Sequence, residues 1–368
     1  MHPNEKVASA SASHASHEHA QASALLPSLP QGADVLLLRL RSLGDLVIET
    51  SVVRALHEWR PDLRISVLAE ERLAAVFEGN PAIAEVILSG GLMATASELR
   101  RRDFAVLFNQ HGGPRSAMLT AMSGAHTKVG WHGYQYDFVY DVKVPDAAEF
   151  FPGTVAHTAE HRLSQLWFAG LPRGPVPPAQ LFPQPDAAAS ASQRLVEKGI
   201  AAGQPYAVLQ PGARTAAMRL PLEKFAALAK WLREAHNIAS VINIGARDEE
   251  LSAQAAQAFH GIAVIPSPPL DVCELIAVTA SAALFVGNDS GPAHIASALD
   301  RPTVTLFSET DPAQWGPRNA RGIAIGTGAT FTHPRGDKAV LQMQPPPRPI
   351  NSISLEEVLQ ACAKVLQK

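Results

Sequence analysis

Short apolar runs followed by amphipathic stretches recur along the chain from residue 34 onward. The first run, 35–38, consists of four large apolar residues and is typical of a buried parallel strand. A polar turn at 42–45 and an amphipathic helix that continues to Leu56 follow it. Further strands are predicted at 64–68, 85–88 and 104–108, with a helix near 72–77. Alternating strands and helices predict a parallel sheet with helices on both faces.

A second alternating series occupies the later part of the chain. Strands are predicted at 206–209, 240–244 and 283–286, and a helix at 222–235. A last helix is predicted over 355–366, after a group of prolines, and is expected to pack back across the domains. The predicted fold class is therefore α/β, with two Rossmann-like, doubly wound parallel-sheet domains that face a central cleft.

Composition sets the predicted domain boundaries. Residues 1–32 are rich in Ala, Ser and His, which favours a disordered tail over a metal site built from His14, His17 and His19. Dense prolines predict a linker at 173–187. The N-terminal domain is predicted at 33–172, the C-terminal domain at 188–345 and the final segment with its helix at 346–368.

Charge and cysteine content exclude several classes of protein. The chain has 31 Lys and Arg against 34 Asp and Glu, so it lacks the basic excess typical of nucleic-acid binding. Cys273 and Cys362 each fall in an apolar helical pattern and are predicted to be buried thiols, without a disulfide or a metal. No apolar run approaches the roughly 18 residues of a membrane span, and no signal peptide is seen, so a cytoplasmic protein is expected.

The turns after the strands are the first places to look for a ligand site, because open parallel sheets bind ligands beyond the carboxyl ends of their strands. In the first turn, Gly44 permits a tight bend and Asp45 begins the next helix. Asp45 either projects a carboxylate into a cleft or caps the helix, and the two interpretations are equally supported. The turn with Gly212, Thr215 and Arg219 suits phosphate binding, although an ordinary surface loop explains it better.

The third turn, 286–294, is the most informative. Pro292 at the start of a predicted helix leaves free backbone amides, which attract a diphosphate. Asp289, Ser290 and His294 crowd the same few positions, which a simple cap does not explain. The chain lacks a phosphate-binding P-loop and a dinucleotide fingerprint, which argues against an NTPase and a dinucleotide-binding oxidoreductase. It also lacks an Asp-x-Asp pair, which commonly holds a metal ion against a diphosphate. Helix amides and cations, with no metal or cofactor, are therefore expected to stabilise a leaving diphosphate.

Together these turns resemble glycosyltransferase family 9, the lipopolysaccharide heptosyltransferases, across nearly the whole chain from 35 to 366. The match is carried by residues 38–40, 42–45 and 79–81, by His157 with Glu160, by 286–294, and by Pro302, 306–307, 310–312 and 315–317. The resemblance implies a GT-B fold, with the acceptor bound mainly by the first domain and the sugar nucleotide by the second. It also implies an inverting, metal-independent transfer from ADP-heptose.

The resemblance assigns roles to individual residues. Asp45 would be the general base, and Asp289, Ser290, Gly291 and His294 would hold the donor diphosphate. Glu249, or its neighbour Glu250, would reach the ribose. The remaining candidates are Gly212, Thr215 and Arg219 for the donor, and Arg41, Ser42, His111 and Arg115 for the acceptor.

One departure from the family pattern concerns the donor. Many members carry a lysine where this chain has Met218, and Arg219 or Arg214 would then supply the missing charge. The leading hypothesis is transfer of heptose to the lipopolysaccharide inner core at the inner membrane. One alternative is transfer of a different sugar to another surface glycan. The other is a non-catalytic sugar-nucleotide-binding protein, against which the presence of Asp45 argues.

Overall fold

The computed structural model describes residues 22–146, 150–151, 156–326 and 348–367, and it divides into two compact units. Within the described residues, the first unit contains the chain up to Leu40, Ser51–Glu71 and Pro81–Pro177. The second contains Arg41–Thr50, Arg72–Asn80 and the chain from Pro178 onward. The turn that carries Asp45 thus packs with the second unit, although its flanking strand belongs to the first.

The first unit is built on a six-stranded parallel sheet in the order β3-β2-β1-β4-β5-β6. Its strands are β1 (Asp34–Leu38), β2 (Arg64–Glu70), β3 (Glu85–Ser89), β4 (Val106–Asn109), β5 (Thr127–Trp131) and β6 (Val142–Val144). The four predicted strands of this half are confirmed. β5 and β6 were not predicted, because β6 is only three residues long and both strands carry lysines.

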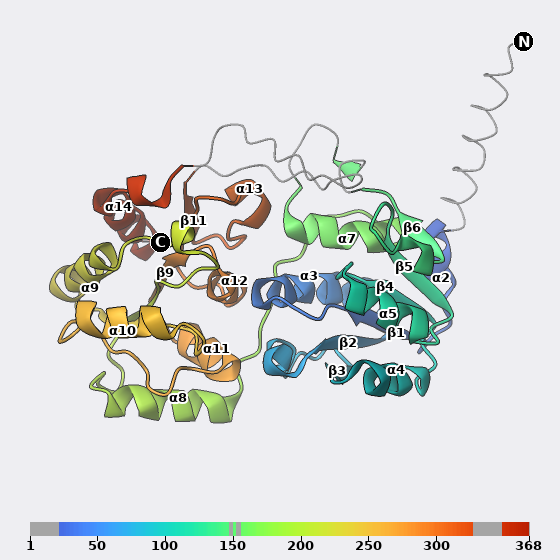
Figure 1. The fold of residues 1–368 in the computed structure, drawn as a ribbon, viewed down its shortest axis with the longest axis horizontal. Helices are drawn as coiled ribbons and strands as arrows, with labels where there is room; N and C mark the ends of the chain where they lie inside the picture. The colour runs from blue at the N-terminus through green and yellow to red at the C-terminus, as the bar shows by residue number, and fades with distance from the viewer. Residues whose placement is uncertain (1–21, 147–149, 152–155, 327–347, 368) are drawn as a thin grey trace, which may run out of the picture. The chain divides into compact units, whose positions relative to one another are not determined.

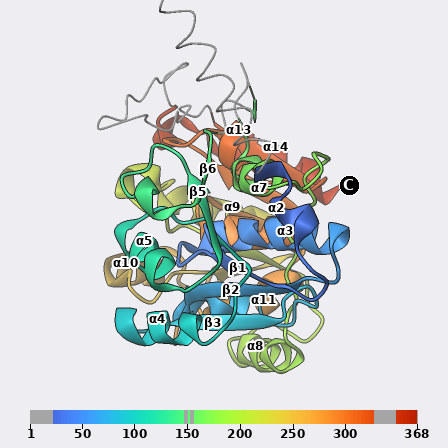
Figure 2. The same ribbon diagram turned by 90° about the vertical axis from the view of Figure 1, so that its right-hand side faces the viewer.

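Helices cover both faces of this sheet. They are α2 (Leu25–Ser28), α3 (Leu43–Trp59), α4 (Leu92–Arg100), α5 (Pro114–Met122) and α7 (Thr158–Phe168), with short 3-10 turns η1 (Glu71–Val76) and η2 (Asp137–Val139). Leu36 and Leu38 point to the face where Leu99 of α4 and Leu119 of α5 pack. Figure 2 shows α4 and α5 on one side of the strands and α3 on the other. The helix predicted near 72–77 is therefore a 3-10 turn.

The prediction of a disordered tail is wrong for residues 22–32. Leu26 is fully buried, and its N–H donates to the carbonyl of Ala169 at 2.9 Å. The guanidinium of Arg60 donates to the carbonyls of Leu26 and Leu29 at 2.9 and 3.0 Å. Burial of the Leu26 side chain thus offsets the entropy cost of ordering this segment, despite its polar composition. The rest of the predicted tail, including the three histidines, lies outside the described residues.

The second unit contains a five-stranded parallel sheet in the order β11-β10-β9-β7-β8. Of these strands, β9 and β11 are labelled in Figure 1. The strands are β7 (Tyr206–Gln210), β8 (Ala239–Ile242), β9 (Leu284–Asn288), β10 (Thr303–Leu306) and β11 (Gly322–Ile325). The helices are α8 (Pro185–Glu197), α9 (Leu222–His236), α10 (Glu249–Ala258), α11 (Val272–Ala280), α12 (Gly291–Ala298), α13 (Pro312–Trp315) and α14 (Leu355–Leu366), with 3-10 turns η3 (Ala216–Met218) and η4 (Ile350–Ser352).

Strands β7, β8 and β9 each contribute to two separate cores. Val208 and Phe285 pack with Leu195 of α8 and the neighbouring helices on one face. Leu209 and Val286 pack on the other face with residues of α9 and α14. Because successive side chains of a strand point to opposite faces, continuous apolar runs here signify burial on both sides. Cys362 is buried as predicted, whereas Cys273 is only partly buried, so the predicted burial is wrong for that residue.

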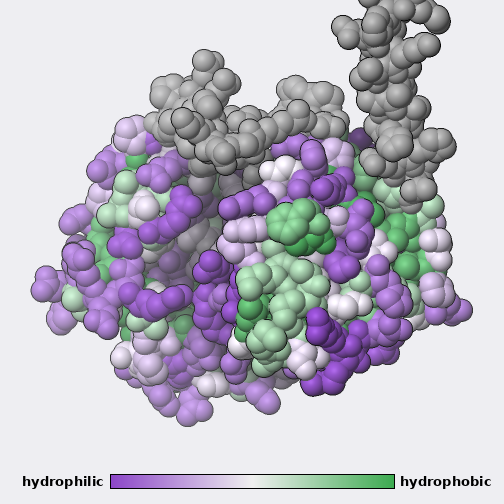
Figure 3. Space-filling model, turned by 45° about the vertical axis from the view of Figure 1, so that its right-hand side comes forward, coloured by the Kyte–Doolittle hydropathy of each residue, from purple (hydrophilic) through white to green (hydrophobic). Residues whose placement is uncertain are grey.

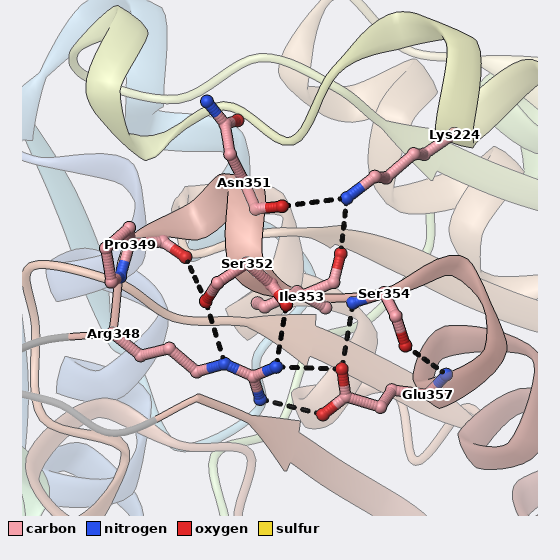
Figure 4. A network of polar contacts seen from close by, with 8 residues as sticks. All are labelled: Lys224, Arg348, Pro349, Asn351, Ser352, Ile353, Ser354 and Glu357. Carbon is pink, nitrogen blue, oxygen red and sulfur yellow. Dashed lines mark hydrogen bonds and ion pairs between the residues drawn. The ribbon is translucent and has the colours of Figure 1, made fainter.

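The last helix is held in the second unit by a polar network (Figure 4). α14 packs on α9, β10 and β11. Lys224 of α9 donates to the carbonyls of Asn351 and Ile353 at 2.9 and 2.6 Å, while Arg348 makes paired bonds to Glu357 at 2.7 and 2.8 Å. The expected packing of this segment across the first domain stays a prediction.

The surface of the first unit carries most of the large exposed apolar side chains in the described ranges. Leu88, Met93, Met118 and Phe138 are 46–75% exposed, on β3, α4, α5 and η2 respectively. α5 packs with both α4 and η2, and apolar residues gather on one face in the space-filling view (Figure 3). Among the described helices none combines the length and the apolar character needed to cross a membrane.

Candidate functional site

The candidate site lies where the strand order of the second unit reverses. The chain runs from β7 outward to β8 and, on the other side, from β9 outward to β10 and β11. The loops that follow β7 and β9 therefore diverge at the carboxyl edge of the sheet and leave a crevice there. These are the second and third turns that the sequence singled out, so the topology brings the two together.

Buried amide side chains fix the loop after β7. Asn288, at the end of β9, accepts the N–H of Leu220 at 3.1 Å and donates to the carbonyl of Pro211 at 2.7 Å. Asn243 donates to Gln210 at 2.6 Å, and Gln210 donates to the carbonyl of Gly212 at 3.2 Å. Satisfied buried amides hold backbone in one conformation. Sequence reasoning assigned no role to these side chains, because their partners are distant in the chain.

The loop after β9 presents the amino end of α12. Ser290 occupies the N-cap position, but its hydroxyl donates to the carbonyl of Asn288 at 3.0 Å and makes no cap bond to the helix. The first amides of α12 are therefore not capped by this side chain. The carboxylate of Asp289 accepts a hydrogen bond from the Thr310 hydroxyl, which fixes the acid beside the helix end.

Asp45 is held in the first turn of α3 by Ser42. The backbone N–H and the hydroxyl of Ser42 donate to Oδ2 of Asp45 at 3.3 and 2.9 Å. The Asp45 side chain is mostly buried, with 9% of the residue exposed. Since the carboxylate accepts an N–H at the helix start and also lines a pocket, the cap interpretation and the site interpretation are compatible.

Two glycines let this turn approach α12 closely. A Cβ on Gly44 would lie 2.6 Å from Cδ2 of His294, and a Cβ on Gly291 would lie 2.8 Å from Cβ of Leu43. Both distances are too short for real side chains. The contact therefore depends on glycine at both positions, and it places the Asp45 turn against the amino end of α12.

These elements enclose a pocket of about 390 Å³. It is lined by Ser42, Leu43, Gly44, Asp45, Arg214, Met218, Asp289, Ser290, Gly291, His294, Thr310 and Trp315. The ring of Trp315 meets that of His294 edge-on, with 6.2 Å between the centroids. The pocket thus combines two carboxylates, a helix amino end, an arginine and a histidine.

Burial lowers the pKa of His294, while the charges of Asp289 and Asp45 act in the opposite direction. The loss of hydration is the larger of these effects, so the imidazole is neutral at neutral pH. A neutral ring has one donor nitrogen and one acceptor nitrogen. It suits a hydrogen-bonding role in the pocket better than that of a fixed positive charge.

The pocket includes seven of the residues to which the sequence assigned a site role: Ser42, Asp45, Arg214, Asp289, Ser290, Gly291 and His294. The other candidates, Gly212, Thr215, Arg219, Glu249, Arg41, His111 and Arg115, are not among its lining residues. The sequence reasoning gave no role to Thr310 or Trp315, although both lie in segments that carried the family resemblance. Their distance from the strand-to-helix turns in the sequence explains this omission.

Two of the candidates outside the pocket lining have clear partners elsewhere. Arg219 donates to the carbonyl of Ala213 and forms an ion pair with Asp248 at 2.8 Å. Arg115 donates to the hydroxyl of Ser89 at 3.2 Å and to the carbonyl of Gly90. Both guanidinium groups therefore hold neighbouring loops. Among the described residues, no group of three or more His, Cys, Asp or Glu side chains is placed to hold a metal ion.

Two parallel-sheet α/β units, with the amino end of α12 at the switch point of the second, fit the GT-B class of glycosyltransferases. The family model for glycosyltransferase family 9 (heptosyltransferase) matches residues 92–340, and the chain belongs to this family. The lipopolysaccharide heptosyltransferase 3 of Escherichia coli is 26% identical over 316 residues, covering 80% of this chain and 89% of that protein.

Solved structures have the same fold. That of the E. coli ADP-heptose lipopolysaccharide heptosyltransferase II superposes with a TM-score of 0.73 at 19% identity, covering 91% of this chain and 98% of that one. That of the E. coli heptosyltransferase WaaC with ADP gives a TM-score of 0.68 at 20% identity, with coverage of 90% and 99%. The predicted family and GT-B architecture are confirmed.

Proposed function

We propose that this glycosyltransferase transfers heptose from ADP-heptose, with inversion and without a metal ion, to the inner core of lipopolysaccharide. The proposal places it in the cytoplasm, in peripheral contact with the inner membrane where this acceptor is assembled. The observation that carries it is a carboxylate, Asp45, in the same pocket as the amino end of α12. Named lipopolysaccharide heptosyltransferases among the relatives support this choice of donor and acceptor.

In this mechanism Asp45 is the general base. It accepts the proton of the acceptor hydroxyl while that oxygen bonds to the anomeric carbon of the donor. The bond from this carbon to the β-phosphate oxygen breaks, and ADP leaves with the electron pair. Ser42, which donates to Oδ2, holds the carboxylate in position. Attack on the face opposite the leaving group inverts the configuration at the anomeric carbon.

The leaving diphosphate is stabilised by groups around α12. The amides at Ser290 and Gly291 and the positive end of the helix dipole favour the developing charge. His294 donates one further hydrogen bond, and Asp289 with Thr310 shapes this end of the pocket. We assign Gly212, Thr215 and Glu249 to the outer part of the donor site, with Glu249 on the ribose. Arg41, His111 and Arg115 are proposed for the acceptor.

The test is product formation from purified protein, ADP-heptose and a heptose-free lipopolysaccharide acceptor, with and without a chelator. Asp45→Asn preserves the shape of the side chain but cannot accept the proton, so we expect kcat to fall by about 10²- to 10⁴-fold. Wild-type transfer should be unaffected by chelation. Equal rates for wild type and Asp45→Asn would exclude the proposed base.

Transfer of another sugar is the second candidate, and Met218 favours it. This apolar side chain lines the pocket at 3% exposure, where many family members carry a lysine. A changed charge next to the diphosphate is compatible with a changed donor. No transfer from ADP-heptose, together with turnover of a different nucleotide sugar, would establish this alternative.

A further inference from the structure

The pocket contains more negative than positive side chains, which poses a problem for an anionic donor. Asp45 and Asp289 both line it. A diphosphate that enters beside two carboxylates needs a compensating cation as well as helix amides. Among the lining residues in the described part of the chain, only Arg214 carries a fixed positive charge. The neutral imidazole of His294 does not supply it.

The neighbouring arginine is committed to a structural role. Arg219 donates to the carbonyl of Ala213 at 3.1 Å through the same nitrogen that lies 2.8 Å from Asp248. This ion pair ties the loop after β7 to the start of α10, and the Arg219 side chain is 26% exposed. Moving it to a phosphate would break both interactions and leave the Asp248 carboxylate without this partner.

Arg214 is bound far more loosely. Its side chain is 71% exposed, and its nearest carboxylate is Glu309, with 4.0 Å between the nitrogen and the oxygen. An exposed ion pair at this distance contributes little to stability. The guanidinium can therefore leave Glu309 at small cost, and its planar donors suit phosphate oxygens.

We propose that Arg214 is the cation that binds the donor diphosphate, with Glu309 as its counter-ion in the unliganded protein. Arg214 then supplies, from an earlier position in the same loop, the charge that Met218 does not provide. The inference rests on the proposed function only in requiring a nucleoside diphosphate donor. It does not depend on which sugar or which acceptor is used.

The experiment measures binding of ADP and AMP to the full-length protein by calorimetry. Removing a charge-assisted bond to phosphate typically weakens binding by about 10- to 100-fold. We expect Arg214→Ala to weaken ADP binding by this factor and AMP binding much less, because AMP lacks the β-phosphate. Arg214→Lys should fall between wild type and Arg214→Ala. Glu309→Gln, which removes the competing carboxylate, should bind ADP several-fold more tightly.

A rescue variant and a matched control complete the design. Met218→Lys in the Arg214→Ala background places a cation on the pocket wall again and should restore much of the ADP affinity. Arg219→Ala is the control for loop damage and should weaken ADP and AMP to a similar extent. Unchanged ADP affinity in Arg214→Ala, or an ADP-selective loss in Arg219→Ala instead, would overturn the assignment.

The two proposals fail in distinguishable ways. If the protein binds UDP or GDP in preference to ADP and Arg214→Ala weakens that binding, the heptose donor is wrong and the role of Arg214 stands. If ADP-heptose is turned over and Arg214→Ala binds ADP like the wild type, the proposed donor is right and the proposed role of Arg214 is wrong. A wild-type protein that binds no nucleoside diphosphate contradicts both.

Discussion

At the scale of the residue, the absence of a Cβ on Gly291 lets Leu43 approach the start of α12. Replacing a helical glycine by alanine usually stabilises a helix by about 1 kcal/mol. Here the new Cβ would lie 2.8 Å from Cβ of Leu43, an atom that cannot rotate away. The substitution is therefore expected to destabilise the protein. We expect Gly291→Ala to lower stability by about 1–3 kcal/mol, as overpacking does. It should also weaken ADP binding, since the amides at the start of α12 must move.

The matched control is Gly245→Ala, because no atom lies within 4 Å of a Cβ built there. Thermal unfolding and ADP titration of both variants check the prediction, and equal behaviour of the two would contradict it. At this scale the sequence was informative where chemistry and local turns coincide, as at Asp45 and His294. It was not informative about Arg219, because the direction of a side chain depends on a partner, Asp248, 29 positions away.

At the scale of elements, the start of α14 is a charge-dependent cap. Glu357 accepts two bonds from Arg348 and one from the N–H of Ser354, and the Arg348 hydrogen bond is the main reason that its pKa is lowered to about 2 (Figure 4). A carboxylate with a lowered folded-state pKa stabilises the fold above its ordinary pKa of 4.5. This contribution is lost as the pH falls from about 4.5 towards 2.

We therefore expect Glu357→Gln to destabilise the protein at pH 7 by about 1 kcal/mol, a value discounted for solvent screening. Its side chain is 38% exposed. Denaturant unfolding should show the difference from wild type shrinking at pH 3. Glu356→Gln, at the preceding residue of the same helix turn, should change the free energy of unfolding little at either pH. A difference that stays constant between pH 7 and pH 3 would mean that the carboxylate charge is not responsible.

Elements were predictable where apolar periodicity is strong and unpredictable where it is not. The prediction for α14 matches its observed bounds, because its apolar positions repeat at helical spacing after a serine cap. β5 was missed because Thr127 and Lys128 are only half-buried and resemble loop residues. The short helix α2 was missed because its few apolar residues are anchored by Arg60 and Ala169, which the local pattern does not reveal.

At the scale of the whole molecule, the two units contribute unequally to the lining of the pocket. All residues that line the pocket, including the Asp45 turn, belong to the second unit. A ligand that binds only the folded state stabilises what it binds, by about 2.7 kcal/mol at a concentration of 100 times Kd. ADP should therefore slow backbone hydrogen exchange in the second unit, most strongly at 42–46, 213–220 and 289–296.

The strands of the first unit provide the internal control for this measurement. β2 and β3 lie in that unit, and exchange there should be unchanged by ADP, since they contribute no residue to the pocket. The Arg214→Ala protein should require a higher ADP concentration for the same protection, with the same pattern once saturated. Protection confined to the first unit would place the nucleotide elsewhere and would exclude the pocket as the donor site.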